Sequence, residues 1–265
     1  MIPLIDADIL RYEIGFAAEA GWRHKTGDPE LIPPWDYVEN CLHQRIDQMM
    51  DDIETEDEPI YYLSGPTNFR NELAVTKPYK GTRPENKPWH FNNLTVYLRD
   101  VLNAVITDGI EADDLITIDH LASEGRTIIC SRDKDLRQVP GWFYSWELGK
   151  QPSFGPLIIP KEGWLKLESP KKLSGCGLVF FYAQCLMGDI VDNVPGLPGC
   201  GPVRAFELLN GLDLPEQLKS LCEAYKGLHG ASWEEHLLEQ GRLLWMTRRL
   251  NEDGTPVLWE IGMDE

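Results

Sequence analysis

The sequence lacks the cysteine patterns that mark disulfide frameworks and zinc sites. Its six cysteines lie far apart, with no Cys-x-x-Cys pair and no histidines at ligand spacing. Such a set predicts reduced thiols, as in a cytoplasmic protein. No apolar run approaches the ~20 residues that a membrane-spanning helix requires, and no basic segment precedes the apolar start Met1–Ile5. We therefore expect a cytoplasmic protein with neither a membrane span nor a secretory signal.

The sequence is also short of basic residues, since 25 lysines and arginines stand against 43 aspartates and glutamates, a net charge of −18. A protein that binds nucleic acid mainly by neutralising phosphates is expected to be basic, so this balance argues against a simple nucleic-acid coat. Two explanations stay open. The acidic excess can be a solvated surface, or part of it can form a metal site whose ions reverse the sign of the local field.

Short apolar runs alternate with helical patterns in the first part of the chain. We expect buried strands at 2–5, 60–63, 104–106 and 127–130, and helices near 9–20, 35–53, 91–103 and 111–123. The alternation favours right-handed βαβ units and a parallel sheet. Ligands collect at the carboxyl ends of such strands, and Asp6 and Asp133 fall there.

After about residue 170 the sequence changes to helical patterns separated by glycine and proline. Helical spacing is found near 178–187, 204–209, 216–225 and 234–249, whereas 142–164 is aromatic and fits neither pattern. The chain is long enough for one large domain or two small ones. We place the boundary at residue 170, with an α/β domain over 1–170 and a helical region over 171–265.

Carboxylates cluster at further places in the chain. They are Glu111, Asp113 and Asp114 at an expected helix start, Asp133 and Asp135 after a strand, and Asp189 with Asp192 one helical turn apart. Each cluster taken alone fits a helix cap, which places acids at the same positions. Together they supply hard oxygen ligands without cysteine or histidine, a set that selects Mg²⁺ or Mn²⁺. Two such ions ~3.5–4 Å apart hydrolyse phosphodiesters by activating water and relieving charge on the leaving oxygen.

A glycine-rich segment adds a feature suited to a nucleic-acid backbone. In Pro195–Ala205, Gly199 and Gly201 permit a tight turn before a helix, as in a helix-hairpin-helix over about residues 188–210. The amides of that helix would hold a phosphate without reading bases, and Arg204 is a candidate phosphate contact. A plain Gly/Pro loop is the alternative.

A basic segment stands out in so acidic a chain. It contains Arg70, Lys80, Arg83 and Lys87, with Tyr79 between them. A solvated loop is one explanation. Beside a metal-bound phosphate, Lys80 and Arg83 would stabilise developing charge, and Tyr79 could stack on a base. We take Lys80 and Arg83 as candidate catalytic residues and the other three as candidate substrate contacts.

The order of these motifs resembles the 5′-nuclease family, which contains flap endonucleases and the 5′→3′ exonucleases of T-odd phages. The matching pieces are Leu4–Asp6, Asn68–Leu73, Tyr79–Arg83, Glu111–Asp114, Ser131–Asp135 and Gly188–Asn193, followed by the hairpin. The resemblance implies a PIN-like α/β fold, with a central, mostly parallel sheet flanked by helices and a C-terminal helix-hairpin-helix region. It also implies a metal-dependent 5′→3′ exonuclease acting on DNA, with flap endonuclease or RNase H-like action left open.

The same resemblance implies how ligands and partners are distributed. One ion would be held mainly by Asp6, Glu111, Asp113 and Asp133, and a second would lie near Asp135, Asp189 and Asp192. Lys80 and Arg83 match the family's catalytic basic residues, and the family's hairpin binds K⁺ and duplex phosphates. We expect two Mg²⁺ or Mn²⁺ ions, K⁺ at the hairpin, and a monomer. We expect its partners to be duplex DNA with a 5′ end, nick, gap or flap, and replication proteins.

Two departures from the family pattern bear on activity. The segment Leu63–Thr67 lacks an aspartate that the family usually has before Phe69 and Arg70. The first metal site would therefore be weaker, or be completed by Asp8 or water. The segment between Arg83 and Phe91 is short for a helical arch, which favours exonuclease action over flap cutting.

Two other functions fit parts of the sequence. A haloacid-dehalogenase-like phosphatase would use Asp6 as nucleophile and Asp8 as acid, with Asp189 and Asp192 in its late acidic motif. The mechanism of such a phosphatase does not require the acids at 111–114 or the hairpin. The other alternative is a DNA-binding relative that has lost hydrolysis together with the missing aspartate.

Overall fold

The computed structural model describes residues 1–82 and 86–264, which form two compact units. Unit 1 takes in Met1–Pro66, Glu85–Asp133 and Trp142–Leu157, and unit 2 takes in Thr67–Pro84, Lys134–Gly141 and Ile158–Glu265. Each unit is therefore assembled from several stretches of chain. The boundary that the sequence suggests at residue 170 falls between two strands of unit 2, and it stays a prediction about the extent of the helical region.

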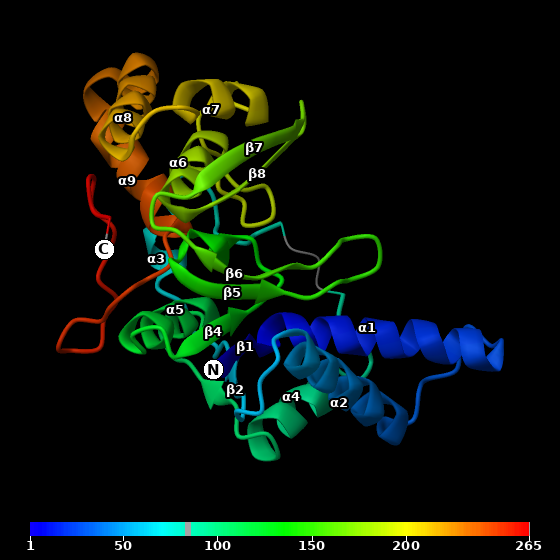
Figure 1. The fold of residues 1–265 in the computed structure, drawn as a ribbon. Helices are drawn as coiled ribbons and strands as arrows, with labels where there is room; N and C mark the ends of the chain where they lie inside the picture. The colour runs from blue at the N-terminus through cyan, green and yellow to red at the C-terminus, as the bar shows by residue number, and fades with distance from the viewer. Residues whose placement is uncertain (83–85, 265) are drawn as a thin grey trace. The chain divides into compact units, whose positions relative to one another are not determined.

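A six-stranded sheet in the order β3-β2-β1-β4-β5-β6 forms the centre of unit 1 (Figure 1). Its strands are β1 (Ile2–Asp6), β2 (Ile60–Leu63), β3 (Val105–Ile106), β4 (Thr127–Cys130), β5 (Gly141–Ser145) and β6 (Phe154–Ile159). β1 pairs in parallel with β2 and β4, β2 with β3, and β4 with β5. The expected parallel sheet is confirmed, with β1 inside it.

Helices cover both faces of this sheet. They are α1 (Ala7–Thr26), α2 (Trp35–Asp52) and α4 (Phe91–Asp100) on one face and α5 (Ala112–Ala122) on the other. Neighbouring residues of a strand point to opposite faces. Tyr61 accordingly packs in the core with the first three helices, whereas Tyr62 donates a 2.7 Å hydrogen bond to Asp119 of α5. Both faces are buried, as a parallel sheet requires.

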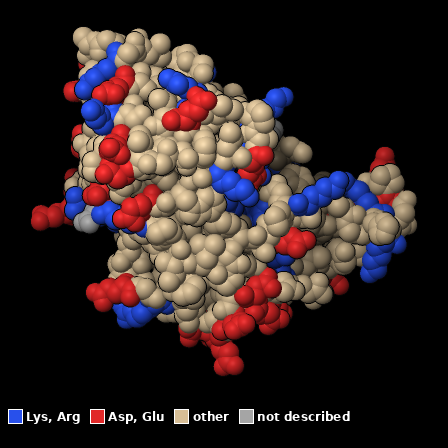
Figure 2. Space-filling view, turned by 45° about the horizontal axis from the view of Figure 1, so that its top comes forward, with Lys and Arg blue, Asp and Glu red and all other residues tan. Residues whose placement is uncertain are grey.

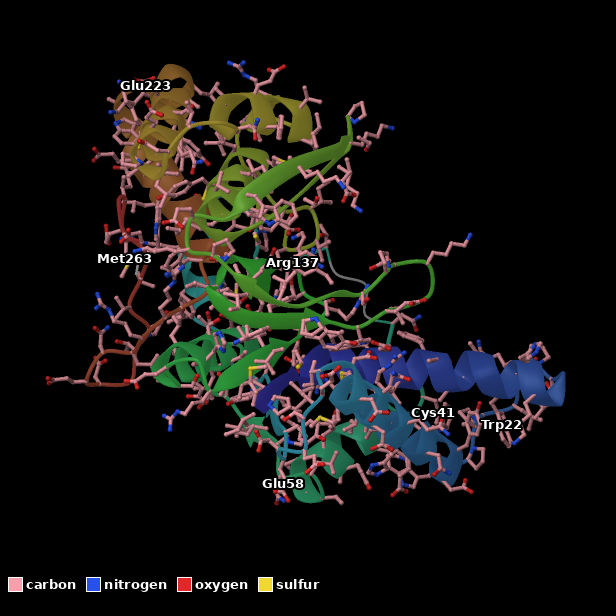
Figure 3. The ribbon with its side chains drawn as sticks, viewed as in Figure 1. Trp22, Cys41, Glu58, Arg137, Glu223 and Met263 are labelled. Carbon is pink, nitrogen blue, oxygen red and sulfur yellow. The ribbon has the colours of Figure 1, made fainter. Side chains whose placement is uncertain are left out.

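The far end of α1 is held by aromatic contacts. Trp22 of α1 lies against Tyr37 of α2, with ring centroids 5.0 Å apart. Figure 3 shows Trp22 near the C-terminal end of α1 and Cys41 on α2.

The six cysteines, all within the described residues, form no disulfide. None of the described helices is long and apolar enough to cross a membrane.

Unit 2 packs around α6 (Gly177–Met187), in which every residue from Gly177 to Leu186 is buried. Its other described helices are α3 (Arg70–Leu73), α7 (Pro202–Leu209), α8 (Leu214–His229) and α9 (Trp233–Leu244), with 3₁₀ turns at Asp135–Gln138 and Gly230–Ser232. The hairpin of β7 (Trp164–Ser169) and β8 (Lys172–Cys176) lies beside α6 and α7 (Figure 1). A helix that is apolar on all sides is stable only when surrounded in this way.

The last helix is shorter than the sequence predicts. α9 ends at Leu244, whereas helical spacing continues to Arg249, so the prediction of helix beyond residue 244 is wrong. The Trp245 carbonyl accepts a 2.7 Å bond from the Arg70 side chain, and the Met246 amide donates to the Gln138 side chain at 3.1 Å. These tertiary bonds satisfy backbone groups that would otherwise need a helix.

Candidate functional site

Asp6 is the last residue of β1 and caps the helix that follows. Its Oδ1 accepts from the amides of Asp8 at 3.1 Å and Ile9 at 3.3 Å. Its Oδ2 accepts from the hydroxyl of Ser131 at 2.7 Å, just beyond the neighbouring strand β4. Asp6 is only 1% exposed. Asp6 therefore caps α1, and this capping uses one of its two carboxylate oxygens.

The carboxylates of Asp8 and Asp133 lie close enough to Asp6 to act on its charge. Burial, followed by the carboxylates of Asp8 and Asp133, raises the pKa of Asp6 to about 7, although the bonds from Ser131 and Ile9 lower it. The Ser131 hydroxyl also accepts from the amide of Asp133 at 2.9 Å. A cation beside these acids would favour their charged forms.

Ser64 and Gly65 occupy the place where the family pattern has a further aspartate. The Ser64 amide donates to Asp8 at 3.1 Å, and the Ser64 hydroxyl accepts from the amide of Ala112 at 2.9 Å. A side chain on Gly65 would meet the carbonyl oxygen of Thr107 at 2.0 Å. Asp8 is therefore the carboxylate that the fold places beside this gap.

The predicted acids Glu111, Asp113 and Asp114 stand at the start of α5. Glu111 and Asp114 form a capping box, in which the Asp114 carboxylate accepts from the Glu111 amide at 3.1 Å. Asp114 is 0% exposed, whereas Glu111 and Asp113 keep partial exposure. The ligand role predicted for Asp114 is not supported by this position, because its carboxylate completes the helix start.

In unit 2, a lysine joins two predicted ligands. The ammonium group of Lys134 lies 2.7 Å from Asp135 and also pairs with Asp189. The side chains of Asp135 and Asp189 are 8% and 5% exposed, whereas that of Lys134 is 48% exposed. The side-chain amide of the buried Gln184 donates to Asp135 as well. The fold thus brings Asp135 and Asp189 together around a positive charge.

Asp189 also organises the loop that carries Asp192. Its carboxylate accepts from the amides of Val191 at 2.7 Å and Asp192 at 3.3 Å. The backbones of Asp189 and Val194 also exchange two hydrogen bonds of 2.8 Å. Burial raises the pKa of Asp189, but Lys134 and these amides hold that pKa below its ordinary value. Asp189 is therefore an ionised anchor of its loop.

Tyr79 and Lys80 lie beside this loop. The Tyr79 hydroxyl donates to the Asp192 carboxylate at 3.0 Å, and the Lys80 amide donates to the Asp192 carbonyl at 2.9 Å. Lys80 has a φ of 54°, and its ammonium lies 4.9 Å from the Tyr79 ring centroid. Because Tyr79 is only 8% exposed, base stacking by its ring is not supported, whereas Lys80 stays a candidate.

Arg70 is buried, in contrast to the phosphate contact that the sequence suggests. It is 0% exposed, and its guanidinium donates to the carbonyls of Leu243 at 3.1 Å and Trp245 at 2.7 Å. A guanidinium held in this way anchors α3 to the end of α9. The substrate-binding role predicted for Arg70 is therefore not supported.

The remaining predicted basic residues are exposed or outside the structure. Lys87 lies over the ring of Phe91, 4.7 Å from its centroid, and is exposed. Arg204 is also exposed, 3.6 Å from Glu207 within α7. Arg83 lies outside the described residues. Lys87 and Arg204 are therefore accessible to a ligand.

The predicted hairpin is the turn between α6 and α7, which pack against each other. Gly199 has a φ of 78°, and Gly201 precedes the first residue of α7. Within this turn, the backbones of Gly188 and Gly196 approach each other closely. A Cβ on Gly196 would lie 2.2 Å from the Gly188 nitrogen, and one on Gly188 would lie 2.3 Å from the Val194 oxygen. Only glycine fits these two positions.

The acids do not form a ready-made metal cage. Among residues 1–82 and 86–264, no three His, Cys, Asp or Glu side chains are gathered as a metal-binding group. The acids instead form one set around Asp6 in unit 1 and the Asp135–Asp189 pair in unit 2. On the face drawn in Figure 2, acidic and basic side chains both occur on a mostly uncharged surface. The charge of −18 is thus not gathered into one patch on that face.

Sequence reasoning missed Ser131, Lys134 and Gln184 as partners of the acids. Ser131 and Lys134 stand within the same short motif as Asp133 and Asp135, which is the available signal. Gln184 is a polar residue inside the apolar run of α6, and it is only 2% exposed. A buried amide in an apolar helix indicates a polar partner.

Comparison with known sequences finds relatives among DNA polymerases, while no family model matches. DNA polymerase I of Lactococcus lactis subsp. lactis (strain IL1403) is 25% identical over 244 residues, and that of Bacillus caldotenax is 29% identical over 234 residues. The matches cover 85% and 82% of this chain but 26% and 25% of the polymerases. The chain thus spans about a quarter of the length of these relatives.

Solved structures share the fold. The D15 flap endonuclease of bacteriophage T5, in a complex with DNA and metal ions, has a TM-score of 0.53 and 17% identity over 92% of this chain and 88% of its own. The catalytic core of Rad2 with a DNA substrate has a TM-score of 0.50 and 14% identity over 98% and 82%. The chain therefore shares the fold of these two nuclease structures. The expected PIN-like α/β fold, with a mostly parallel sheet flanked by helices, is confirmed. The helix-hairpin-helix role of the turn between α6 and α7 stays a prediction.

Proposed function

We propose that the chain is a divalent-metal-dependent nuclease that acts on DNA from a 5′ end. The observation that carries the proposal is the buried Asp6 at the carboxyl end of β1, joined through Ser131 to the segment after β4 that bears Asp133. Parallel sheets place their ligands at this edge. The T5 and Rad2 structures in complex with DNA, and the DNA polymerase I relatives, support the same function.

The donor set fits two Mg²⁺ or Mn²⁺ ions, because carboxylate oxygens suit hard cations. Two observations mark places that call for positive charge. Burial and then its acidic neighbours raise the pKa of Asp6, and the ammonium of Lys134 stands between Asp135 and Asp189. We propose Asp6, Glu111, Asp113 and Asp133 as ligands of one ion, and Asp135, Asp189 and Asp192 as ligands of the other. When bound, the ions supply an activated water and relieve charge on the leaving oxygen.

The protein's own cations and amides would bind and orient the DNA backbone. A hydrogen bond from the Lys80 amide to the Asp192 carbonyl holds Lys80 beside the Asp189–Asn193 loop. The Lys80 ammonium is therefore suited to neutralise a phosphate oxygen. Arg83 is proposed for the same role, with Lys87 as a further phosphate contact. At the hairpin, amides in the first turn of α7 have no acceptor within the helix and suit another phosphate, aided by Arg204. K⁺ at the hairpin carbonyls completes this part of the proposal.

Duplex DNA with a 5′ end, nick, gap or flap is the proposed substrate. We further propose that the protein acts as a monomer. The DNA polymerase I relatives make replication proteins the natural class of partner.

A phosphatase of the haloacid-dehalogenase type is disfavoured by the contacts of Asp8. One Asp8 oxygen pairs with Arg11 at 2.7 Å, and the other accepts from the Ser64 amide at 3.1 Å. Both Asp8 oxygens therefore accept hydrogen bonds, whereas a general acid must carry a proton on one of its oxygens. Asp6, the nucleophile of that mechanism, is likewise committed to capping and to Ser131.

The test is cleavage of 5′-labelled blunt, nicked, gapped and flapped duplexes with and without Mg²⁺ or Mn²⁺, followed by product length. We expect metal-dependent release of short products from the 5′ end. Binding without metal-dependent cleavage would contradict the proposal and favour a DNA-binding relative. Lys80→Ala is expected to lower the rate more than the affinity, whereas Lys77→Ala, at an exposed neighbouring position, should change neither.

A further inference from the structure

The carboxylates of Asp135 and Asp189 share one positive charge, the side-chain ammonium of Lys134. Lys134 Nζ lies 2.7 Å from Asp135 Oδ1 and pairs with Asp189 Oδ2, and the Gln184 amide donates to the same Asp135 oxygen. Two carboxylates that are 8% and 5% exposed repel each other strongly, since little water screens them. The lysine therefore supplies charge that this place requires.

The surroundings also contain an oxygen that lacks a donor. The side-chain oxygen of Gln184 is buried and has no hydrogen-bond partner among the described residues, although its amide nitrogen is bound to Asp135. Buried polar atoms are seldom left in this state. An additional oxygen beside two carboxylates is the donor chemistry that a hard divalent ion uses.

Lys134 is attached in a way that lets it withdraw. Its side chain is 48% exposed, its ammonium is strongly hydrated in water, and its stem of four carbons is flexible. Arg70 offers the opposite case, because it is 0% exposed and bound to two carbonyls within the core. Lys134 can exchange its carboxylate partners for water, whereas Arg70 cannot do so without opening the unit.

We propose that Lys134 is a tethered counter-cation that competes with a divalent ion for Asp135 and Asp189. The ion enters as the ammonium group withdraws into solvent. Lys134 thus sets the ion concentration at which this site fills, and it stabilises the two carboxylates when no ion is bound. The inference rests on the proposed function, because the ion concerned is one that the nuclease would use.

The test compares Lys134→Met with Lys172→Met, in metal-free protein without DNA. Both substitutions remove one positive charge from unit 2, but Lys172 pairs with Glu168 at 2.6 Å on the exposed β7–β8 hairpin. Titration with MnCl₂, with free Mn²⁺ read by electron paramagnetic resonance, gives the number of bound ions and their Kd. We expect one ion to bind Lys134→Met about tenfold more tightly than the wild type. Lys172→Met should bind as the wild type does.

Thermal unfolding supplies a second readout. In EDTA, Lys134→Met is expected to have a lower Tm than the wild type, and Mn²⁺ should raise its Tm by more than it raises that of the wild type. Adding Asp189→Asn to Lys134→Met should remove the gained affinity, which identifies the site.

Unchanged or weaker Mn²⁺ binding by Lys134→Met would overturn the inference, because a lysine that only supports the fold does not oppose the ion. The outcome is separable from that of the cleavage assay. A protein that cleaves DNA but fails this titration keeps its proposed function and loses the inference. One that passes the titration without cleaving DNA loses only the proposed function.

Discussion

The hydroxyl of Ser131 donates a 2.7 Å hydrogen bond to the carboxylate of Asp6 and so joins the end of β1 to the residue that follows β4. The same hydroxyl accepts from the amide of Asp133. One small side chain therefore orients two of the proposed metal ligands. The acids alone do not reveal this, because the contact spans 125 positions of sequence.

Ser131→Ala should destabilise the protein. The substitution leaves the buried Asp6 carboxylate with only backbone donors and leaves the Asp133 amide without its acceptor, at a cost of about 1–3 kcal/mol. Urea unfolding measures the loss. Ser169→Ala is the control, since Ser169 makes its 3.3 Å contact with the Lys171 amide in an exposed turn. Equal stability of the two variants would contradict the role given to Ser131.

Asp189→Asn combined with Asp192→Asn should abolish most cleavage and preserve DNA binding. Asparagine retains an oxygen that can accept from the Val191 amide, so the loop is expected to keep its shape. The loss of two anionic ligands should lower the single-turnover rate by at least about a hundredfold. Asp253→Asn, in an exposed turn, is the control. Unchanged turnover in the double variant would refute the ligand assignment.

Arg70→Met separates a structural role from a phosphate contact. Removing the guanidinium leaves the Leu243 and Trp245 carbonyls unpaired, and we expect a loss of roughly 2–4 kcal/mol in the free energy of unfolding. Arg70→Lys should not restore it, because an ammonium lacks the planar fork that reaches both carbonyls. Chemical denaturation gives the stability and a DNA titration the affinity. Full stability with weakened DNA binding would favour the phosphate contact instead.

Gly188→Ala and Gly199→Ala should differ sharply, although both glycines have positive φ. At Gly199, with φ of 78°, a Cβ would meet nothing within 4 Å, so only backbone strain of about 1–2 kcal/mol is added. At Gly188 the Cβ would also lie 2.3 Å from the Val194 oxygen, which forces the loop apart. We expect the lower Tm for Gly188→Ala. A lower Tm for Gly199→Ala would contradict the packing described for this turn.

His229 is expected to titrate below its ordinary pKa of 6.5. Burial and then the stacked His236, with ring centroids 3.9 Å apart, lower its pKa. Since folding favours the neutral ring, this group's contribution to stability is present above pH 6.5 and is lost as the pH falls below that value. An NMR titration should show the lowered pKa and its return toward 6.5 in His236→Gln. A pKa at or above 6.5 in the wild type would contradict the stacking.

Regular local patterns made most of unit 1 predictable. The expected helix over 35–53 is found at Trp35–Asp52, and the strands at 60–63 and 127–130 have the expected bounds. Each of these elements shows its buried face in its own periodicity. The sequence does not predict the strands within 142–164, because their aromatic residues fit no single period and their pairing partners lie elsewhere in the chain.

The site was predictable as a list of ligands but not as a set of contacts. Asp6 and Asp133 follow short apolar strands, and their place at a sheet edge comes from topology alone. The pairing of Lys134 with Asp189 joins positions 55 apart, and Arg70 reaches a carbonyl 175 positions away. Charge at a position in the sequence does not distinguish a cation that faces solvent from one that is enclosed by later residues.

Because the segments of the two units alternate along the chain, the units become complete at different times during synthesis. Once the ribosome has released Leu157, every segment of unit 1 exists, but α6, around which unit 2 packs, has not been made. Tyr79 must then wait for Asp192, which is 113 residues further along. Residues 67–82 therefore lack their partners in unit 2 at that stage, and incomplete segments of this kind are exposed to chaperones and proteases. Unit 2 is completed last, whatever its own stability.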